Sequence, residues 1–540
     1  MTFGVVLVAW AGYVIYVGGL LPLGGNDALS YHLPRAVFFG RAHGFGDFEG
    51  GDPRLANWPA NYELMLAAVL ALDGSDRHIV VLSALGFVLF VFAAGALVER
   101  WNPRATWLGK IACMALAASA PVVLLHAGAV KNDLLTNFFF LSAFLALGSL
   151  LTTGSRRSWV MLSVSMGLAL GTKLSASMLV VGVLVVGLSA VLTRGVSRPP
   201  RPPVLALAAL LLTGPVVYVI NLVKLGRVVG IPAVAGGAYG AWTNLWRFPY
   251  LLFTAPFSET PHGVWSFWTH RYWFWERYDT FSSQLGMAVS VLLLLVPAGI
   301  LLTRGDGARE RRLGSLAALV SFFAILPTRL QPDGFFCTFT RFICFVVPVI
   351  GVWTLVPLIT RLPERWGAVV ALLSVALFGT QAVLSAVHDV SHPLAAVQRC
   401  AGGGACAIRF GSGRACVALN QVAGPTDAVL MDADFDAWSY PCFGPTRGRA
   451  LEMLPEHREG AVFIPPAVRW VVIDRMWNIT WGHPAFTDFG HFFEDVGKGK
   501  PTPGDTALFL QLEHDPAFRR VFSNPRQNQA LFERVQTPRI

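Results

Sequence analysis

Four side chains suited to acid–base and phosphate chemistry lie close together near the start of the chain. They are Asp27, Tyr31, His32 and Arg35, in the segment PLGGNDALSYHLPRAVFF. On a helix that begins near Asp27, Tyr31 and Arg35 lie one turn apart on one face, with His32 beside them. A carboxylate can accept a proton from an attacking hydroxyl, and a guanidinium can bind a phosphate through two hydrogen bonds. The segment is a candidate catalytic loop, although a helix cap at Asp27 and headgroup contacts for His32 and Arg35 fit the same residues.

A second carboxylate with cations around it starts a later apolar run. Asp133 opens DLLTNFFFLSAFLALGSLL and follows Lys131, while Lys173 and Arg341 lie at the ends of other apolar runs. The ordinary roles of such residues are an N-cap for the aspartate and snorkelling for the cations. If the cations point inward, they would neutralise a phosphate. Asp27 and Asp133 could also hold a divalent cation, Mg or Mn, because these hard ions prefer oxygen ligands.

Two segments supply further residues that could line a substrate cleft. Asn61 and Glu63 lie in WPANYELM, and His270, Arg271 and Glu276 lie in a Trp-rich stretch near residue 270. The tryptophans there are more typical of an interfacial aromatic belt than of a sugar-binding platform. We group these five residues with Tyr31 as candidates for the cleft.

The elements that must position these side chains are membrane helices. The chain has 540 residues, of which 54% are hydrophobic and only 14% are charged, a profile typical of a polytopic membrane protein. Its net charge of +10 reflects basic residues in short gaps between apolar runs, so it indicates topology and no nucleic-acid partner. Eleven apolar runs are predicted to cross the membrane, at residues 3–22, 79–98, 106–126, 134–152, 159–172, 174–193, 203–222, 286–303, 314–328, 342–360 and 367–388.

Basic residues fall mainly in alternate gaps, which the positive-inside rule assigns to the cytoplasm. Residues 105–155 then form a hairpin with its tip outside, and 159–193 form a second one. The loops 23–78 and 223–285 are outside as well. Asp27, Asp133 and Lys173 are therefore predicted to share the extracytoplasmic face of a bacterial inner membrane.

The polar region after residue 388 is predicted to be a small extracytoplasmic α/β domain, residues 389–540, attached to a transmembrane catalytic domain, residues 1–388. AVLMDADF and RWVVIDRMW are typical of short buried strands, and FRRVFSNPRQNQALFERV of a hairpin. Cysteines in an oxidising compartment form disulfides, and four of them allow three pairings. The four are Cys400, Cys406, Cys416 and Cys442.

Five motifs, taken in order, resemble the GT-C superfamily of integral membrane glycosyltransferases. They are NDALSYHLPRA, WPANYELMLAAVLAL, VKNDLLTNFFFLSAFLAL, GLALGTKLSASMLV and TRFICFVVPVIGV. The resemblance covers about residues 1–360 and is greatest to glycosyltransferase family 39 and its bacterial relatives, the protein O-mannosyltransferases and the lipid A aminoarabinose transferase. SYPCFGPTRGRALEML and the terminal hairpin resemble the outer domain of many bacterial members. This chain departs from the mannosyltransferases in having Asn26 before Asp27 where they have an Asp-Glu pair.

The resemblance implies an inverting transfer from a polyprenyl-phosphate sugar to a lipid, glycan or protein acceptor at the outer membrane face. Asp27 matches the catalytic acid of the family's first loop, and Asp133 matches the acid of its second outer loop. Lys173 and Arg341 match basic residues near the lipid phosphate, and His32, Arg35 and Lys131 are expected to bind the donor with them. A direct displacement needs no enzyme nucleophile, so Asp27 would act as the general base.

Three other functions remain open from the sequence, and one of them is a structural or sensory protein whose outer α/β domain is anchored by the membrane helices. A flippase or transporter of lipid-linked sugars would place charges along a path through the membrane, whereas here they gather at the ends of helices. A glycan ligase would use a polyprenyl-diphosphate donor in place of the monophosphate.

Overall fold

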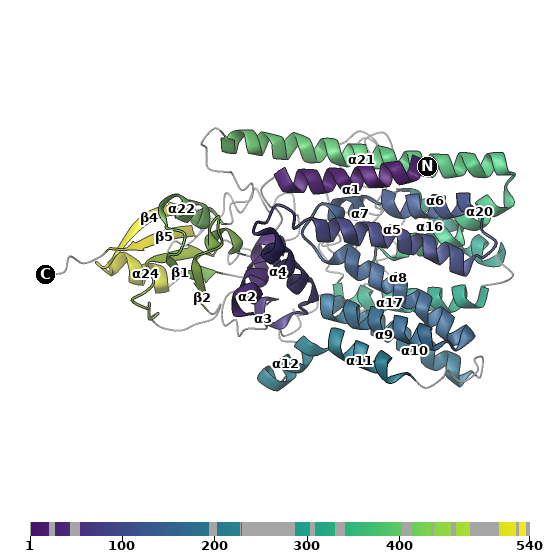
Figure 1. The fold of residues 1–540 in the computed structure, drawn as a ribbon, viewed down its shortest axis with the longest axis horizontal. Helices are drawn as coiled ribbons and strands as arrows, with labels where there is room; N and C mark the ends of the chain where they lie inside the picture. Colours follow the sequence, from purple (N-terminus) through teal and green to yellow (C-terminus); the bar gives the residue numbers. More distant parts are fainter. Residues whose placement is uncertain are drawn as a thin grey trace. The chain divides into compact units, whose positions relative to one another are not determined.

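The computed structural model describes residues 2–20, 27–43, 54–193, 202–226, 228, 287–302, 308–329, 341–401, 413–433, 437–454, 461–475, 507–524 and 529–535. The chain divides into two compact units (Figure 1). The helical unit comprises Met1–Gly18, Pro59–Tyr62 and Val80–Val390, and the mixed unit comprises Gly19–Trp58, Glu63–Ile79 and Ser391–Ile540. The predicted division at residues 388/389 stays a prediction.

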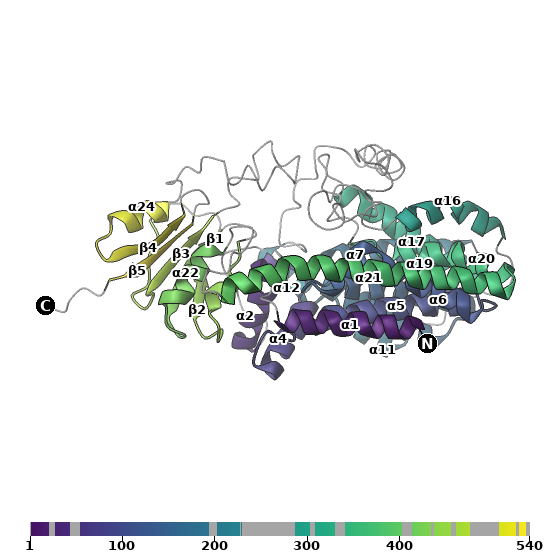
Figure 2. The same cartoon turned by 90° about the horizontal axis from the view of Figure 1, so that it is seen from above.

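The helical unit is built from packed helices, and every predicted apolar run of the sequence coincides with one or two of them. In chain order they are α1 (Thr2–Leu20), α5 (Val81–Trp101), α6 (Trp107–Ser119), α7 (Pro121–Ala127), α8 (Asp133–Thr153), α9 (Arg156–Thr172), η2 (Leu174–Ala176), α10 (Ser177–Leu192), α11 (Val204–Thr213), α12 (Val216–Leu225), α16 (Met287–Leu302), α17 (Ala308–Arg329), α19 (Val346–Trp353), α20 (Leu355–Arg361) and α21 (Glu364–Ala401). Helix α8 packs against α5, α9 and α17, and α10 packs against α17 (Figures 1 and 2).

The predicted count of eleven membrane spans is not confirmed. Among the described residues, five helices are long and apolar enough to cross a membrane, or up to seven if each of two bent helix pairs is one span. The pair α6–α7 bends by 70° and the pair α11–α12 by 60°. Pro121 and Pro215 follow the two breaks, and a proline cannot donate the backbone hydrogen bond that would continue a helix. The protein is nevertheless a mainly helical, polytopic membrane protein.

A buried carboxylate ties three helices of this unit together. Glu310 of α17 is 8% exposed and accepts hydrogen bonds from Arg100 Nε at 2.6 Å and Arg100 Nη2 at 2.7 Å on α5. It also accepts one from Thr152 Oγ1 on α8 at 2.8 Å. At Gly148 of α8 an added Cβ would lie 2.9 Å from the Glu310 carbonyl oxygen, so the close approach of α8 and α17 requires a glycine.

We expect Glu310→Gln to lower the free energy of unfolding by about 2 kcal/mol, because it weakens charge-assisted hydrogen bonds to a buried group. Chemical unfolding in detergent micelles measures the change. Glu99→Gln is the matched control, since Glu99 also pairs with a cation, Lys110, at 2.6 Å, but its side chain is 72% exposed. No measurable change is expected there. Equal losses in the two variants would contradict this account of Glu310.

The mixed unit combines the first-loop helices with a sheet. The helices of the first loop are η1 (Ala28–His32), α2 (Leu33–Ala42), α3 (Arg54–Asn57) and α4 (Asn61–Asp73). The C-terminal part contains α22 (Arg414–Val422), η3 (Tyr440–Phe443) and α24 (Ala507–His514), with strands β1 (Ala428–Ala433), β2 (Ala450–Met453), β3 (Trp470–Asp474), β4 (Phe518–Asn524) and β5 (Gln529–Arg534).

The five strands form one sheet in the order β2-β1-β3-β5-β4. β1 runs parallel to β2 and β3, whereas β5 is antiparallel to β3 and β4. Residues of β3 are buried on both faces, because Val471 and Ile473 pack with Leu508 and Leu512 of α24 while α22 contacts β3 and β5. Figure 2 shows the two helices on either side of the strands. The predicted small C-terminal α/β fold, with its buried strands and terminal hairpin, is confirmed.

Candidate active site

All the described candidate residues except Asn61 lie in two clusters, one in each unit. The first-loop cluster, in the mixed unit, consists of Asp27, Ser30, Tyr31, His32, Arg35, Arg54, Trp58 and Glu63. The Asp133 cluster, in the helical unit, consists of His126, Lys131, Asn132, Asp133, Asn137, Lys173, Arg341 and Phe342. Each is described by itself.

Asp27 precedes a π-helix, η1, and is 9% exposed. Its side chain makes no capping hydrogen bond to that helix. The guanidinium of Arg54 lies nearby, with Nη1 3.9 Å from Asp27 Oδ1. Short π-helical turns often occur at functional sites. The structure therefore gives Asp27 a cationic neighbour and no capping role in η1.

Arg54 is a residue that the sequence analysis missed. Its guanidinium lies 4.3 Å from the ring centroid of Tyr31 and 5.7 Å from that of Trp58, and its Nη2 donates to Ser30 Oγ at 3.4 Å. The residue is 4% exposed. One signal in the sequence could have identified it, because Arg54 is the only lysine or arginine between residues 42 and 76.

His32 and Arg35 are both buried against Glu63 and do not reach outward. His32 Nδ1 lies 2.6 Å from Glu63 Oε1, and Arg35 Nη1 lies 3.9 Å from Glu63 Oε2. Arg35 also donates to the Trp58 carbonyl oxygen at 2.5 Å. Burial lowers the pKa of Arg35, and the charge of Glu63 opposes that shift. Glu63 thus acts as an internal counter-ion that holds η1, α2 and α4 together.

Asn61, another candidate for the cleft, has a packing role in the helical unit. Its Nδ2 donates to the carbonyl oxygen of Thr213 at 2.7 Å, at the end of α11. The candidates His270, Arg271 and Glu276 lie outside the described residues.

The carboxylate of Asp133 is buried among basic side chains, and the residue is 1% exposed. Lys173 Nζ lies 2.7 Å from Asp133 Oδ1, and Arg341 Nε lies 3.8 Å from the same oxygen. Lys131, in the turn before α8, acts on Asp133 electrostatically. Lysines and arginines thus outnumber the carboxylate, so the cluster can attract and neutralise an anion such as a phosphate.

Backbone and amide contacts fix the positions of these charged groups. Asn132 takes the N-cap position of α8, and its Oδ1 accepts a hydrogen bond from Lys173 Nζ at 2.8 Å. Lys173 itself terminates α9, and its ammonium lies 4.6 Å from the ring centroid of Phe342. The side-chain amide of Asn137 donates to the Arg341 carbonyl oxygen at 2.9 Å and accepts from the backbone amide of Phe345 at 2.8 Å.

The sequence analysis missed both Asn137 and His126. His126 lies on α7 with its Nδ1 3.7 Å from Asp133 Oδ2, and the two side chains are 5% and 1% exposed. A single histidine or asparagine within an apolar run carries no distinguishing pattern. The seven-residue separation of His126 and Asp133, at the tip of the predicted hairpin 105–155, is the signal that could have linked these two residues.

The divalent cation stays a prediction. Within the described part of the chain, no group of three or more His, Cys, Asp or Glu residues could hold a metal ion. Asp27 and Asp133 belong to different units.

Comparisons with known proteins give a match in fold only. No protein-family model and no curated protein matches the sequence. The crystal structure of ArnT from Cupriavidus metallidurans bound to undecaprenyl phosphate matches 99% of this chain and 98% of ArnT, with a TM-score of 0.60 and 14% identity. The same protein in the apo state matches with a TM-score of 0.53 and 14% identity, over 98% of this chain and 97% of ArnT. The chain therefore shares the fold of ArnT over nearly its whole length, which confirms, at the level of the fold, the resemblance that its motifs carry.

Proposed function

We propose that this protein is a membrane glycosyltransferase that moves a sugar from a polyprenyl-phosphate donor to a hydroxyl acceptor. The observation that carries the proposal is the near full-length fold match to ArnT bound to undecaprenyl phosphate. The two charged clusters supply the chemistry that such a reaction needs.

Departure of the lipid phosphate is the step that the Asp133 cluster supports. When the bond between the anomeric carbon and the phosphate oxygen breaks, its electron pair leaves with polyprenyl phosphate. Preformed cations stabilise that developing charge. Lys173 and Arg341 are the cations proposed for this role, and Asp133 holds the Lys173 ammonium at 2.7 Å.

Activation of the acceptor is the role we assign to Asp27. The acceptor hydroxyl forms the new bond to the anomeric carbon and gives its proton to the carboxylate, so one displacement inverts the configuration. Arg54 Nη1 lies 3.9 Å from Asp27 Oδ1 and gives the carboxylate a cationic neighbour. We place the reaction on the extracytoplasmic face, which the alternation of basic gaps in the sequence supports.

Reconstitution into lipid vesicles with a crude acceptor extract tests this function against the transporter. The proposal predicts a sugar covalently attached to the acceptor, with the anomeric configuration opposite to that of the donor. Movement of intact donor between leaflets without such a product would overturn it in favour of a flippase. A product with retained configuration would exclude the single displacement.

A further inference from the structure

A short segment of the C-terminal region, Ser439–Phe443, contacts the helices that carry the first-loop cluster. Ser439 Oγ donates a long hydrogen bond of 3.5 Å to the carbonyl oxygen of Ser30 in η1. The ring of Phe443 packs edge-on against Phe38 of α2, with centroids 5.3 Å apart. The Tyr440 hydroxyl donates to Asp76 Oδ2 at 3.0 Å, beyond the end of α4. One segment therefore supports three parts of the first loop.

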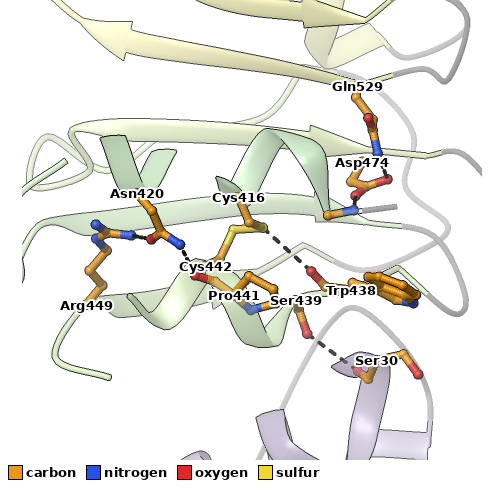
Figure 3. The surroundings of a disulfide bond; sticks show 11 residues. Ser30, Cys416, Asn420, Trp438, Ser439, Pro441, Cys442, Arg449, Asp474 and Gln529 are labelled. Atoms are coloured by element: carbon orange, nitrogen blue, oxygen red, sulfur yellow. Dashed lines mark hydrogen bonds between the residues drawn. A yellow bond between two sulfur atoms is a disulfide. The ribbon is translucent and has the colours of Figure 1, made fainter. Parts of the chain in front are cut away.

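The segment is held to α22 by a covalent bond. Of the three pairings that the sequence left open, the described residues contain the bond between Cys416 and Cys442, and both cysteines are fully buried (Figure 3). Asn420, one turn beyond Cys416, adds a hydrogen bond from its Nδ2 to the Pro441 carbonyl oxygen at 3.2 Å. The disulfide thus fixes η3 to a helix of the sheet domain.

Helix α22 is in turn anchored at both ends. At its start, the buried carboxylate of Asp474, at the end of β3, accepts a hydrogen bond from the Gly413 amide at 2.6 Å and another from Gln529 Nε2 at 3.1 Å (Figure 3). At its end, Arg449 donates to the carbonyl oxygens of Ala423 at 3.0 Å and Gly424 at 2.9 Å. These contacts fix α22 to the sheet, and the disulfide in turn fixes η3 to α22.

A continuous series of contacts leads from this segment to Asp27. The Cys442 amide donates to the Ser439 carbonyl oxygen at 3.0 Å, and Ser439 donates to the backbone of Ser30. The Ser30 hydroxyl accepts from Arg54 at 3.4 Å, and Arg54 faces Asp27 at 3.9 Å. Since Ser30 lies within the π-helical turn that follows Asp27, displacement of η3 would move the base and its cation together.

We propose that the Cys416–Cys442 disulfide and the Ser439–Phe443 segment are positioning elements for Asp27, so that the C-terminal domain is a working part of the active site. This inference rests on the proposed function for its effect on catalysis. It also predicts, independently of any activity, that the disulfide and this segment protect the backbone amides of η1 and α2 from hydrogen exchange.

The test compares the full-length double variant Cys416→Ser/Cys442→Ser with the wild type in lipid vesicles. We expect kcat to fall on the order of 100-fold, as for a displaced catalytic group, while KM for the donor changes little. Amide hydrogen exchange of residues 28–42 should become roughly tenfold faster, with exchange in α5 and α8 unchanged. Cys113→Ser, a buried unpaired cysteine of α6, is the matched control and should alter none of these quantities.

A second variant covers the case in which the double variant does not fold. Phe443→Leu keeps the disulfide but removes the ring contact with Phe38, so a smaller loss of kcat and a smaller gain in exchange are expected. Unchanged exchange over 28–42 in a folded variant would overturn the inference. If the wild type shows no sugar transfer while amide exchange over residues 28–42 is still faster in the variants, the proposed function fails and the positioning claim stands.

Discussion

Replacing Asp27 with asparagine is expected to lower kcat for sugar transfer by about 10²- to 10⁴-fold with little change in KM for the donor. The amide keeps the size and shape of the side chain but cannot accept the hydroxyl proton. Because Asp27 makes no capping hydrogen bond to η1, the loss should not come from unfolding of that helix. Initial rates over a range of donor concentrations separate kcat from KM.

Asp73→Asn is the control for this prediction. Asp73 belongs to the same unit, and its carboxylate accepts hydrogen bonds from Ser75 and His78 at the end of α4. Its loss should leave kcat unaltered. If Asp27→Asn kept the wild-type kcat, the residue would be a structural one and the assignment of the base would be wrong.

Lys173→Met is expected to lower kcat/KM for the donor by about 10²- to 10³-fold, the effect of removing one preorganised charge from a site where negative charge develops. The same change leaves the buried Asp133 without the cation 2.7 Å away. Loss of one partner of a buried ion pair costs about 3–5 kcal/mol of stability. Both effects are measurable, by initial rates and by chemical unfolding.

A double variant separates the catalytic effect from the structural one. In Lys173→Met/Asp133→Asn the buried charge is gone, so stability should recover in part while kcat/KM stays low. Lys110→Met, at an exposed pair with Glu99, should change neither quantity. Recovery of activity together with stability in the double variant would mean that Lys173 serves only to balance Asp133.

The charge pattern of the sequence predicted more of the Asp133 cluster than of the first-loop cluster. Alternating basic gaps predict that the start of α8 and the end of α9 lie on one side of the membrane, and in the structure Lys173 and Arg341 lie within 3.8 Å of Asp133. The positive-inside rule predicts the side on which each helix end lies from the order of the helices alone, and it needs no knowledge of side-chain packing. The partners that fix these groups, Asn137 and His126, depend on packing and could not be read from single residues.

In the first-loop cluster, the spacing of residues along a predicted helix was not enough to identify which side chains contact one another. The expectation that His32 and Arg35 bind the donor phosphate stays a prediction, and what spacing did not show is Glu63, 31 residues beyond His32 and 2.6 Å from the His32 ring. Arg54 was overlooked because its significance comes from Tyr31, Trp58 and Asp27 around it. The bends before Pro121 and Pro215 likewise altered two predicted spans, since hydropathy does not register a break in a helix.

The most direct test of the central claim is to identify the carrier lipid that the protein releases when a sugar is transferred. Purified protein in vesicles is given an acceptor extract and a panel of sugars on polyprenyl monophosphate or polyprenyl diphosphate, and the free lipid is quantified by chromatography and mass spectrometry. Our account predicts one polyprenyl phosphate released for each sugar transferred from a monophosphate donor, and none from diphosphate donors. Release of polyprenyl diphosphate would identify a ligase, and product without any released carrier would contradict the account altogether.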